Sequence, residues 1–236
     1  MPDPWRIEER VAPPADLTGS WPSVERDPTA RAVARCRPTG TAVVLGSTQR
    51  HDPVAGGPVG VEVVRRRSGG GAVLVAPHDP VWIDVWVPVE DLLWTADVTD
   101  AFLWLGRTWG EALGRLGLTG VDVQGAAPGA CTRWSGLVCF GGVGAGEVTV
   151  DGRKVVGLAQ RRTRHGAWFH GACVVRWDPT VLLAALGLSG DEREAAARGL
   201  AGAVAGVADI GVAQGIDVPA DADGVAGAFL EALTGR

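Results

Sequence analysis

Three arginines and three glycines lie together in the stretch "VVRRRSGGGAV", which runs from Val63 to Val73. Glycine has no Cβ, so its backbone can approach another group closely and point N–H groups at an oxygen atom. Positive side chains beside such a turn favour a phosphate or a carboxylate. The stretch therefore predicts a binding turn made by Arg65, Arg66, Ser68, Gly69, Gly70 and Gly71. A tight turn at a sheet edge with solvated arginines is the simpler alternative.

A lysine follows an Asp-Gly pair in the stretch "GEVTVDGRKVVGLAQRR". The pair Asp151-Gly152 predicts a type I′ hairpin turn, because both central residues of that turn need a positive φ. A loop of this length pairs Thr149 with Lys154 and places Glu147 opposite Val156. Paired residues share a sheet face. We therefore expect Glu147, Thr149 and Lys154 on one face, with Gly157 and the neighbouring valines on the other.

A cysteine, Cys139, stands a few residues before this hairpin. A thiolate is a strong nucleophile and a good leaving group in thioester chemistry. The ammonium group of Lys154, if close, would favour the charged form of that sulfur. A buried cysteine without a chemical role is the alternative for Cys139. It is also the interpretation of the remaining cysteines, Cys36, Cys131 and Cys173.

Read together, these motifs resemble the lipoate–protein ligase A family and the related octanoyltransferases. The resemblance covers roughly Val43 to Val175. It rests on the Arg-Arg-x-Ser-Gly-Gly-Gly turn, on Gly-Arg-Lys-x-x-Gly-x-Ala-Gln from Gly152 to Gln160, and on "FHG" at Phe169–Gly171. It implies the biotin/lipoate protein ligase catalytic fold, with Lys154 touching the acyl carbonyl. It also implies substrate contacts at the arginine–glycine turn and at Glu147, Gly157, Ala159 and His170, although His170 could equally be structural.

Two reactions are implied by the family. A transferase takes octanoyl from acyl carrier protein, holds it as a thioester on Cys139 and needs no cofactor. A ligase adenylates lipoate with ATP and Mg, and Cys139 is then dispensable. Either enzyme acylates a lysine of lipoyl domains, such as the glycine cleavage H protein and the E2 subunit of 2-oxoacid dehydrogenases. The stretch "LVCFGG", with Cys139, resembles one transferase branch, whereas "SGGGAV" is closer to the ligases.

Two departures from the family pattern favour a third hypothesis, a catalytically silent acyl-binding homologue. The family follows its glycines with His-Asp, whereas Leu74-Val75 stand here and His78-Asp79 come later. The family's N-terminal helix has no counterpart before Ala42.

The sequence patterns of the strands and helices that must position these residues predict an α+β fold. We expect a mostly antiparallel sheet flanked by helices, with Ile83, Val85 and Val87 alternating against Trp82, Asp84 and Trp86. Apolar spacing predicts a helix that begins near Asp97 and ends at Gly117. We divide the chain into an irregular N-terminal arm (1–30), an acyl-transfer catalytic domain (31–178) and a helical C-terminal segment packed on the same domain (179–236).

Composition excludes several other functions. The 236 residues carry a formal net charge of −5 and are 46% hydrophobic, which suits a globular domain and disfavours nucleic-acid binding. We predict no metal site. We also predict no membrane span and, from the lack of a signal-peptide pattern, a cytoplasmic location. Arginines around the proposed site could attract acidic partners such as acyl carrier protein or lipoyl domains.

Overall fold

The computed structural model describes residues 4–49, 58, 60–127, 129–216 and 221–235. Its larger sheet has seven strands, and every neighbouring pair is antiparallel except β1 with β2. The predicted α+β fold with a mostly antiparallel sheet is therefore confirmed. In spatial order the strands are β1 (Arg6–Ala12), β2 (Ala32–Pro38), β6 (Val81–Pro88), β10 (Gly166–Cys173), β9 (Arg153–Thr163), β8 (Val148–Val150) and β7 (Val121–Val123).

The two faces of this sheet bury different cores, as the alternation along β6 predicts. Ile83, Val85 and Val87 pack with helices α3 (Ala101–Arg115) and α7 (Ala222–Thr234). Trp82 and Trp86 belong to a separate apolar cluster on the opposite face. The period of two in β6 thus assigns each side chain to one layer of the molecule.

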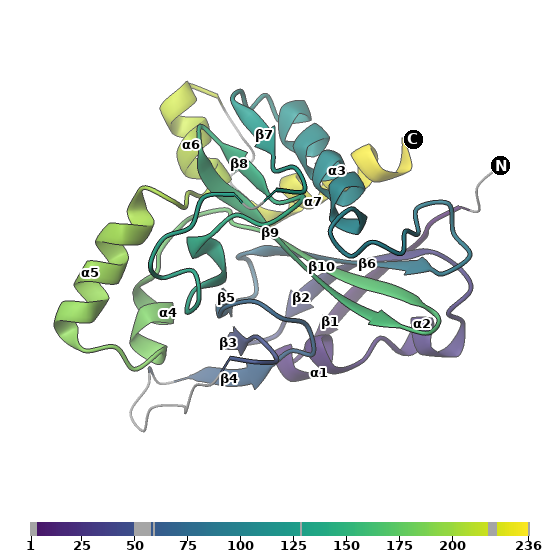
Figure 1. Ribbon diagram of the computed structural model, residues 1–236, viewed down its shortest axis with the longest axis horizontal. Coiled ribbons are helices and arrows are strands. Elements are labelled where there is room, and N and C mark those ends of the chain that lie inside the picture. The colour runs from purple at the N-terminus through teal and green to yellow at the C-terminus, as the bar shows by residue number, and fades with distance from the viewer. Residues whose placement is uncertain (1–3, 50–57, 59, 128, 217–220, 236) are drawn as a thin grey trace.

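A second, smaller sheet lies on the tryptophan side (Figure 1). It consists of β4 (Val61–Arg65), β3 (Thr41–Leu45) and β5 (Val73–Val75), in that order. Helix α1 (Pro14–Gly19) and helix α2 (Pro22–Arg26) complete this layer. The two sheets therefore face each other, and the apolar cluster between them includes Val44, Val75 and Trp82.

The N-terminal residues are not the irregular arm that the sequence predicted. Strand β1 pairs in parallel with all seven residues of β2 and forms one edge of the larger sheet. Its burial alternates along the strand, because Arg6, Glu8 and Arg10 point partly into the protein while the residues between them are exposed. The sequence did not predict this strand, because its partly buried positions carry charged residues and a strand is recognised in sequence by apolar residues at alternate positions.

The C-terminal segment is helical, as predicted. It contains α4 (Thr180–Ala185), α5 (Gly190–Ala201), α6 (Val207–Gln214) and α7. Helix α7 packs on α3, where the rings of Trp109 and Phe229 have centroids 4.3 Å apart. Helix α3 begins at Ala101, about one turn after Asp97, and the Asp97 carboxylate accepts the N–H groups of Thr99 and Asp100 in the turn that leads into the helix, as a capping residue does.

The hairpin of β8 and β9 confirms the predicted turn and corrects the predicted register. Asp151 and Gly152 have φ values of 49° and 75°, and Thr149 pairs with Lys154. The position opposite Val156 belongs to Val148, however, and not to Glu147, because the register shifts between Val148 and Thr149. This bulge turns Gly157 toward Lys154: a Cβ added to Gly157 would lie 3.5 Å from the Cε of Lys154. The prediction that Gly157 lies on the opposite face was wrong.

Within the described ranges, none of the helices has both the length and the apolar character needed to cross a bilayer.

Candidate active site

An apolar pocket lies between the two sheets, with an empty volume of about 530 Å³ that includes its mouth. Val44, Val73 and Val75 line it from the small sheet. On the large sheet the lining includes Gly157, Ala159 and Ala172, whose small side chains leave the space open. Such a pocket suits a hydrocarbon chain, because apolar walls offer nothing to a polar ligand along most of their length.

The predicted nucleophile lies at this pocket. Cys139 starts a short 3₁₀ turn, η1 (Cys139–Gly141), lines the pocket and is half-buried. Its backbone N–H donates to the carbonyl of Ala72, 3.0 Å away, which ties the turn to the end of the glycine stretch. Cys36 and Cys173 are buried as predicted, whereas the prediction was wrong for Cys131, which is exposed.

The glycine turn is packed directly against Cys139. Gly70 has a φ of 95°, which an L-residue rarely adopts, and a Cβ there would lie 3.5 Å from the Cys139 sulfur. A Cβ on Gly71 would lie 2.7 Å from the backbone nitrogen of Cys139. The glycines are thus needed for a close approach, but in this structure the approaching group is the backbone of the chain itself.

Substitution of Gly71 by alanine is expected to destabilise the protein by about 1–3 kcal/mol, because the added methyl overlaps backbone that cannot move independently. Chemical denaturation measures this loss. Gly69→Ala is the matched control, since a Cβ on Gly69 meets nothing within 4 Å. Equal stability of the two variants would contradict the packing argument.

The arginines of the turn contact protein carbonyls. Arg66 is 6% exposed and donates to the carbonyl oxygens of Val44, Gly69 and Gly71. Burial lowers the pKa of Arg66, while the neighbouring Cys139 side chain opposes that shift. Arg65 donates to the carbonyls of Gly46 and Gln49 and does not line the pocket. Arg66 is therefore the cation beside the Cys139 thiol.

Ser68 lies inside the turn, and its side chain is not a pocket-lining group. The residue is 1% exposed, and its hydroxyl has no hydrogen-bond partner among the described residues. Its predicted contact with substrate stays a prediction.

Lys154 is fully buried and is held by three acceptors. Its Nζ lies 3.0 Å from the carbonyl oxygen of Cys139, 2.8 Å from that of Gly142 and 2.5 Å from Oε2 of Glu147. Glu147 in turn accepts the backbone N–H groups of Gly144 and Leu158. An ammonium group has three hydrogens, so these contacts use all of them. Lys154 thus organises the backbone around Cys139, and Glu147 orients Lys154.

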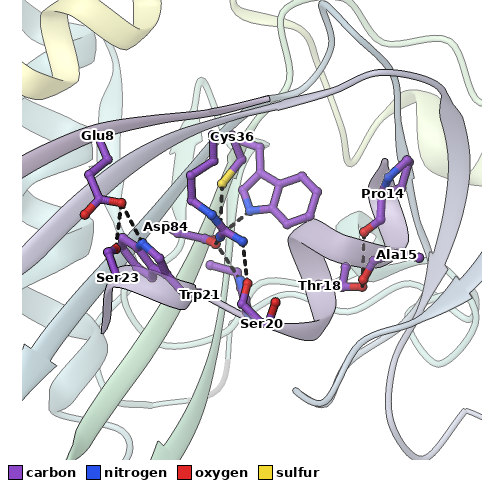
Figure 2. A network of polar contacts seen from close by, with 12 residues as sticks. Glu8, Pro14, Ala15, Thr18, Ser20, Trp21, Ser23, Cys36 and Asp84 are labelled. Atoms are coloured by element: carbon purple, nitrogen blue, oxygen red, sulfur yellow. Dashed lines mark hydrogen bonds and ion pairs between the residues drawn. The ribbon is translucent and has the colours of Figure 1, made fainter. Parts of the chain in front are cut away.

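His170 lines the same pocket from β10 and belongs to a network that the sequence did not reveal. Its Nδ1 lies 2.8 Å from Asp84, whose side chain is 0% exposed. Asp84 also accepts from the indole of Trp82 at 2.7 Å and from Arg10 at 3.1 Å. The Arg10 guanidinium also donates to the Cys36 sulfur and to the Ser20 carbonyl, and Figure 2 shows Asp84, Cys36 and Ser20 lying close together. Asp84 was visible in the sequence only as a polar residue in an apolar strand, and Arg10 lay in the supposed arm.

Arg10→Met is expected to lower the free energy of unfolding by about 2–3 kcal/mol, because it leaves the buried Asp84 carboxylate with fewer partners. Thermal and chemical denaturation test this. Arg6→Met, on the same strand but with a partly exposed ion pair to Glu8, should cause a much smaller loss. Comparable losses in both variants would show that Asp84 does not depend on Arg10.

The displaced His-Asp pair does not return to the pocket. Asp79 accepts the backbone N–H groups of Val175 and Arg176 and lies in a neighbouring cavity with Trp177. His78 is exposed. The pair therefore takes no part in the lining of the apolar pocket.

Comparison with known proteins agrees with this fold. The profile of the lipoyl protein ligase A/B catalytic domain matches residues 26–234, and the chain belongs to that family.

Among its relatives is octanoyltransferase LipM of Carboxydothermus hydrogenoformans, which is 32% identical over 121 residues. That match spans 51% of this chain and 42% of the relative.

Solved structures share the fold. A bipartite lipoate protein ligase from Thermoplasma acidophilum, solved in a study of the enzyme and its E2 lipoyl domain, superposes with a TM-score of 0.68 at 20% identity. That match covers 99% of this chain and 84% of the other. Lipoate-protein ligase A bound with ATP gives a TM-score of 0.65 at 19% identity, covering 100% of this chain and 85% of that one.

Proposed function

We propose that this protein transfers octanoyl or lipoyl groups to the lysine of lipoyl domains, and that the acyl group passes through a thioester on Cys139. The observation that carries the proposal is the placement of Cys139, a half-buried thiol at an apolar pocket with a guanidinium beside it. A cysteine without a chemical role needs neither the pocket nor the cation.

The first half-reaction forms the acyl-enzyme. The Cys139 thiolate attacks the carbonyl carbon of an octanoyl thioester on acyl carrier protein, and the carrier's sulfur leaves and takes up a proton. The Arg66 guanidinium beside Cys139 is the cation that faces the negative charge developing at the reacting sulfur. The acyl chain lies along Gly157 and Ala159 in the pocket.

The second half-reaction returns the thiol. The neutral amine of the acceptor lysine attacks the thioester carbonyl, the Cys139 sulfur leaves as thiolate, and the new amide nitrogen loses a proton to solvent. Lys154 supports both steps by fixing the carbonyls of Cys139 and Gly142, which sets the direction of the thiol. The Thermoplasma acidophilum ligase, described together with its E2 lipoyl domain, suggests E2-type lipoyl domains as acceptors here.

The alternative is an ATP-dependent ligase, in which lipoate is adenylated before transfer and no bond forms to Cys139. Its support is the fold shared with the ATP-bound ligase. That reaction would use ATP and Mg. In the part of the chain that the structure describes, no three His, Cys, Asp or Glu side chains are grouped as a metal site.

One pair of assays separates these reactions. The native protein is incubated with octanoyl-acyl carrier protein and weighed intact, and separately assayed for pyrophosphate exchange with lipoate and ATP. An octanoyl adduct without exchange supports the transferase. Exchange without an adduct assigns the ligase instead. If the native protein shows neither an adduct nor exchange, both reactions are rejected and the silent homologue is favoured.

A further inference from the structure

A second cavity lies beside the apolar pocket, with an empty volume of about 780 Å³ that includes its mouth. Val73 and Phe140 line both cavities and so form the wall between them. Strand β5 alternates across this wall, because Val75 lines the apolar pocket and Leu74 lines the second cavity. Phe140 directly follows Cys139 in the chain, so the second cavity begins next to the residue that carries the thiol.

The lining of this second cavity combines apolar walls with a few polar groups. Leu74, Val181 and Leu182 supply aliphatic surface, and the ring of Trp177 packs against Phe140 with centroids 6.2 Å apart. The indole nitrogen of Trp177 is buried and has no hydrogen-bond partner among the described residues. A buried donor without an acceptor costs free energy, so a ligand carbonyl that pairs with it gains a hydrogen bond. The cavity therefore suits a ligand that has both aliphatic groups and a carbonyl oxygen.

The charges around the second cavity favour a neutral ligand. Among the described residues that line it, Asp79 and Asp178 are acidic and Arg176 is the one cation. Arg176 is itself paired with Asp209, at 3.5 Å. A triphosphate would therefore meet more carboxylates than free cations, and like charges brought together cost affinity. The carboxylates of Asp79 and Asp178 accept backbone N–H groups, and their remaining lone pairs can accept amide N–H groups of a ligand.

We propose that the second cavity holds the pantetheine arm of the octanoyl donor while the octanoyl chain occupies the apolar pocket. Pantetheine is uncharged, carries amide and hydroxyl groups, and has a branched aliphatic end, which matches the lining. Its sulfur bonds to the acyl carbonyl carbon that Cys139 attacks. The acyl chain and the arm must therefore leave that point in different directions, and the cavities on either side of Phe140 provide them. The inference rests on the proposed function, because it assumes a thioester donor.

Donors that share one acyl group and differ in the arm test the proposal. Intact mass follows the rate of Cys139 acylation in the full-length native protein. One donor is octanoyl-N-acetylcysteamine, whose arm ends after its first amide, and the other is octanoyl-pantetheine, which has the whole arm. We expect kcat/KM to be about tenfold higher with octanoyl-pantetheine, because only that donor fills the second cavity.

Two substitutions and a control locate the arm. Val181→Trp places a larger side chain in the cavity from helix α4, so it should abolish the preference and leave the rate with octanoyl-N-acetylcysteamine within about twofold of native. Trp177→Phe keeps an aromatic ring and removes the unpaired indole N–H, so it should lower kcat/KM for octanoyl-pantetheine about fivefold. Val212→Trp, at an exposed position of α6 outside both cavities, should change neither rate.

The outcomes separate this inference from the proposed function. If both donors acylate the native protein at equal rates, or if Val181→Trp slows both equally, the arm lies elsewhere and the inference is rejected while thioester transfer stands. If neither donor acylates Cys139, the proposed function fails as well. Where Val181→Trp does not fold, the conservative Trp177→Phe decides, and equal kcat/KM for octanoyl-pantetheine in that variant and the native protein rejects the inference.

Calorimetry of the native protein with free pantetheine and with adenosine monophosphate tests the other occupant of the cavity. Neither probe carries an acyl group, so binding is measured without transfer. Binding of pantetheine that is weakened in Trp177→Phe supports the inference. Binding of the nucleotide alone, weakened by the same substitution, would assign the cavity to a nucleotide and overturn it.

Discussion

Replacement of Cys139 by serine is expected to reduce acyl transfer from octanoyl-acyl carrier protein at least about 1,000-fold. A serine hydroxyl is not ionised near neutral pH, and Arg66 cannot compensate for that difference. The substitution removes little volume from a half-buried position, so the protein should remain folded. Single-turnover kinetics with a lipoyl domain as acceptor measure the effect, and intact mass should show no adduct.

Cys131→Ser is the matched control for this experiment. Cys131 is also a free cysteine in the same loop region, but it is exposed and does not line the pocket. Its variant should transfer octanoyl at the native rate. Full activity in Cys139→Ser would end the thioester proposal, and loss of activity in both variants would point to a general effect of cysteine removal.

Lys154→Met is expected to lower the free energy of unfolding by about 3–5 kcal/mol. Lys154 and Glu147 have side chains that are 1% and 7% exposed, so the carboxylate would be left buried without its cation. The carbonyls of Cys139 and Gly142 would also lose their donor. Acyl transfer should fall in addition, because the turn that carries the thiol is no longer fixed. Equilibrium denaturation with urea gives the stability change.

A double variant isolates the ion pair from the rest of the site. Lys154→Met combined with Glu147→Gln removes both charges, so it should be less destabilised than the sum of the single changes. Arg198→Met, in an exposed pair with Glu194 on α5, should change stability little. Additive losses from the Lys154 and Glu147 substitutions would show that the two side chains are not energetically coupled.

The sequence alone determined the features that depend on neighbouring residues. The Asp151-Gly152 turn follows from the positive φ that both positions must adopt, and the structure has it. The two faces of β6 follow from strict alternation of side chains, and the apolar spacing predicted helix α3 to within a turn at its start. The motifs around Arg65–Gly71 and Lys154 also pointed to the family, whose catalytic-domain profile matches residues 26–234.

Only the tertiary structure decided how those residues use their polar groups. Lys154 was expected beside the sulfur of Cys139, and its ammonium group donates to the backbone carbonyl of that residue, while buried Arg66 lies beside the Cys139 side chain. One bulge turned Gly157 toward Lys154, because a shift of one residue reverses every side chain beyond it. Arg10 and Asp84 are 74 residues apart, and no local pattern links them. A buried charge needs a partner of opposite charge, and the tertiary fold decides which residue supplies it.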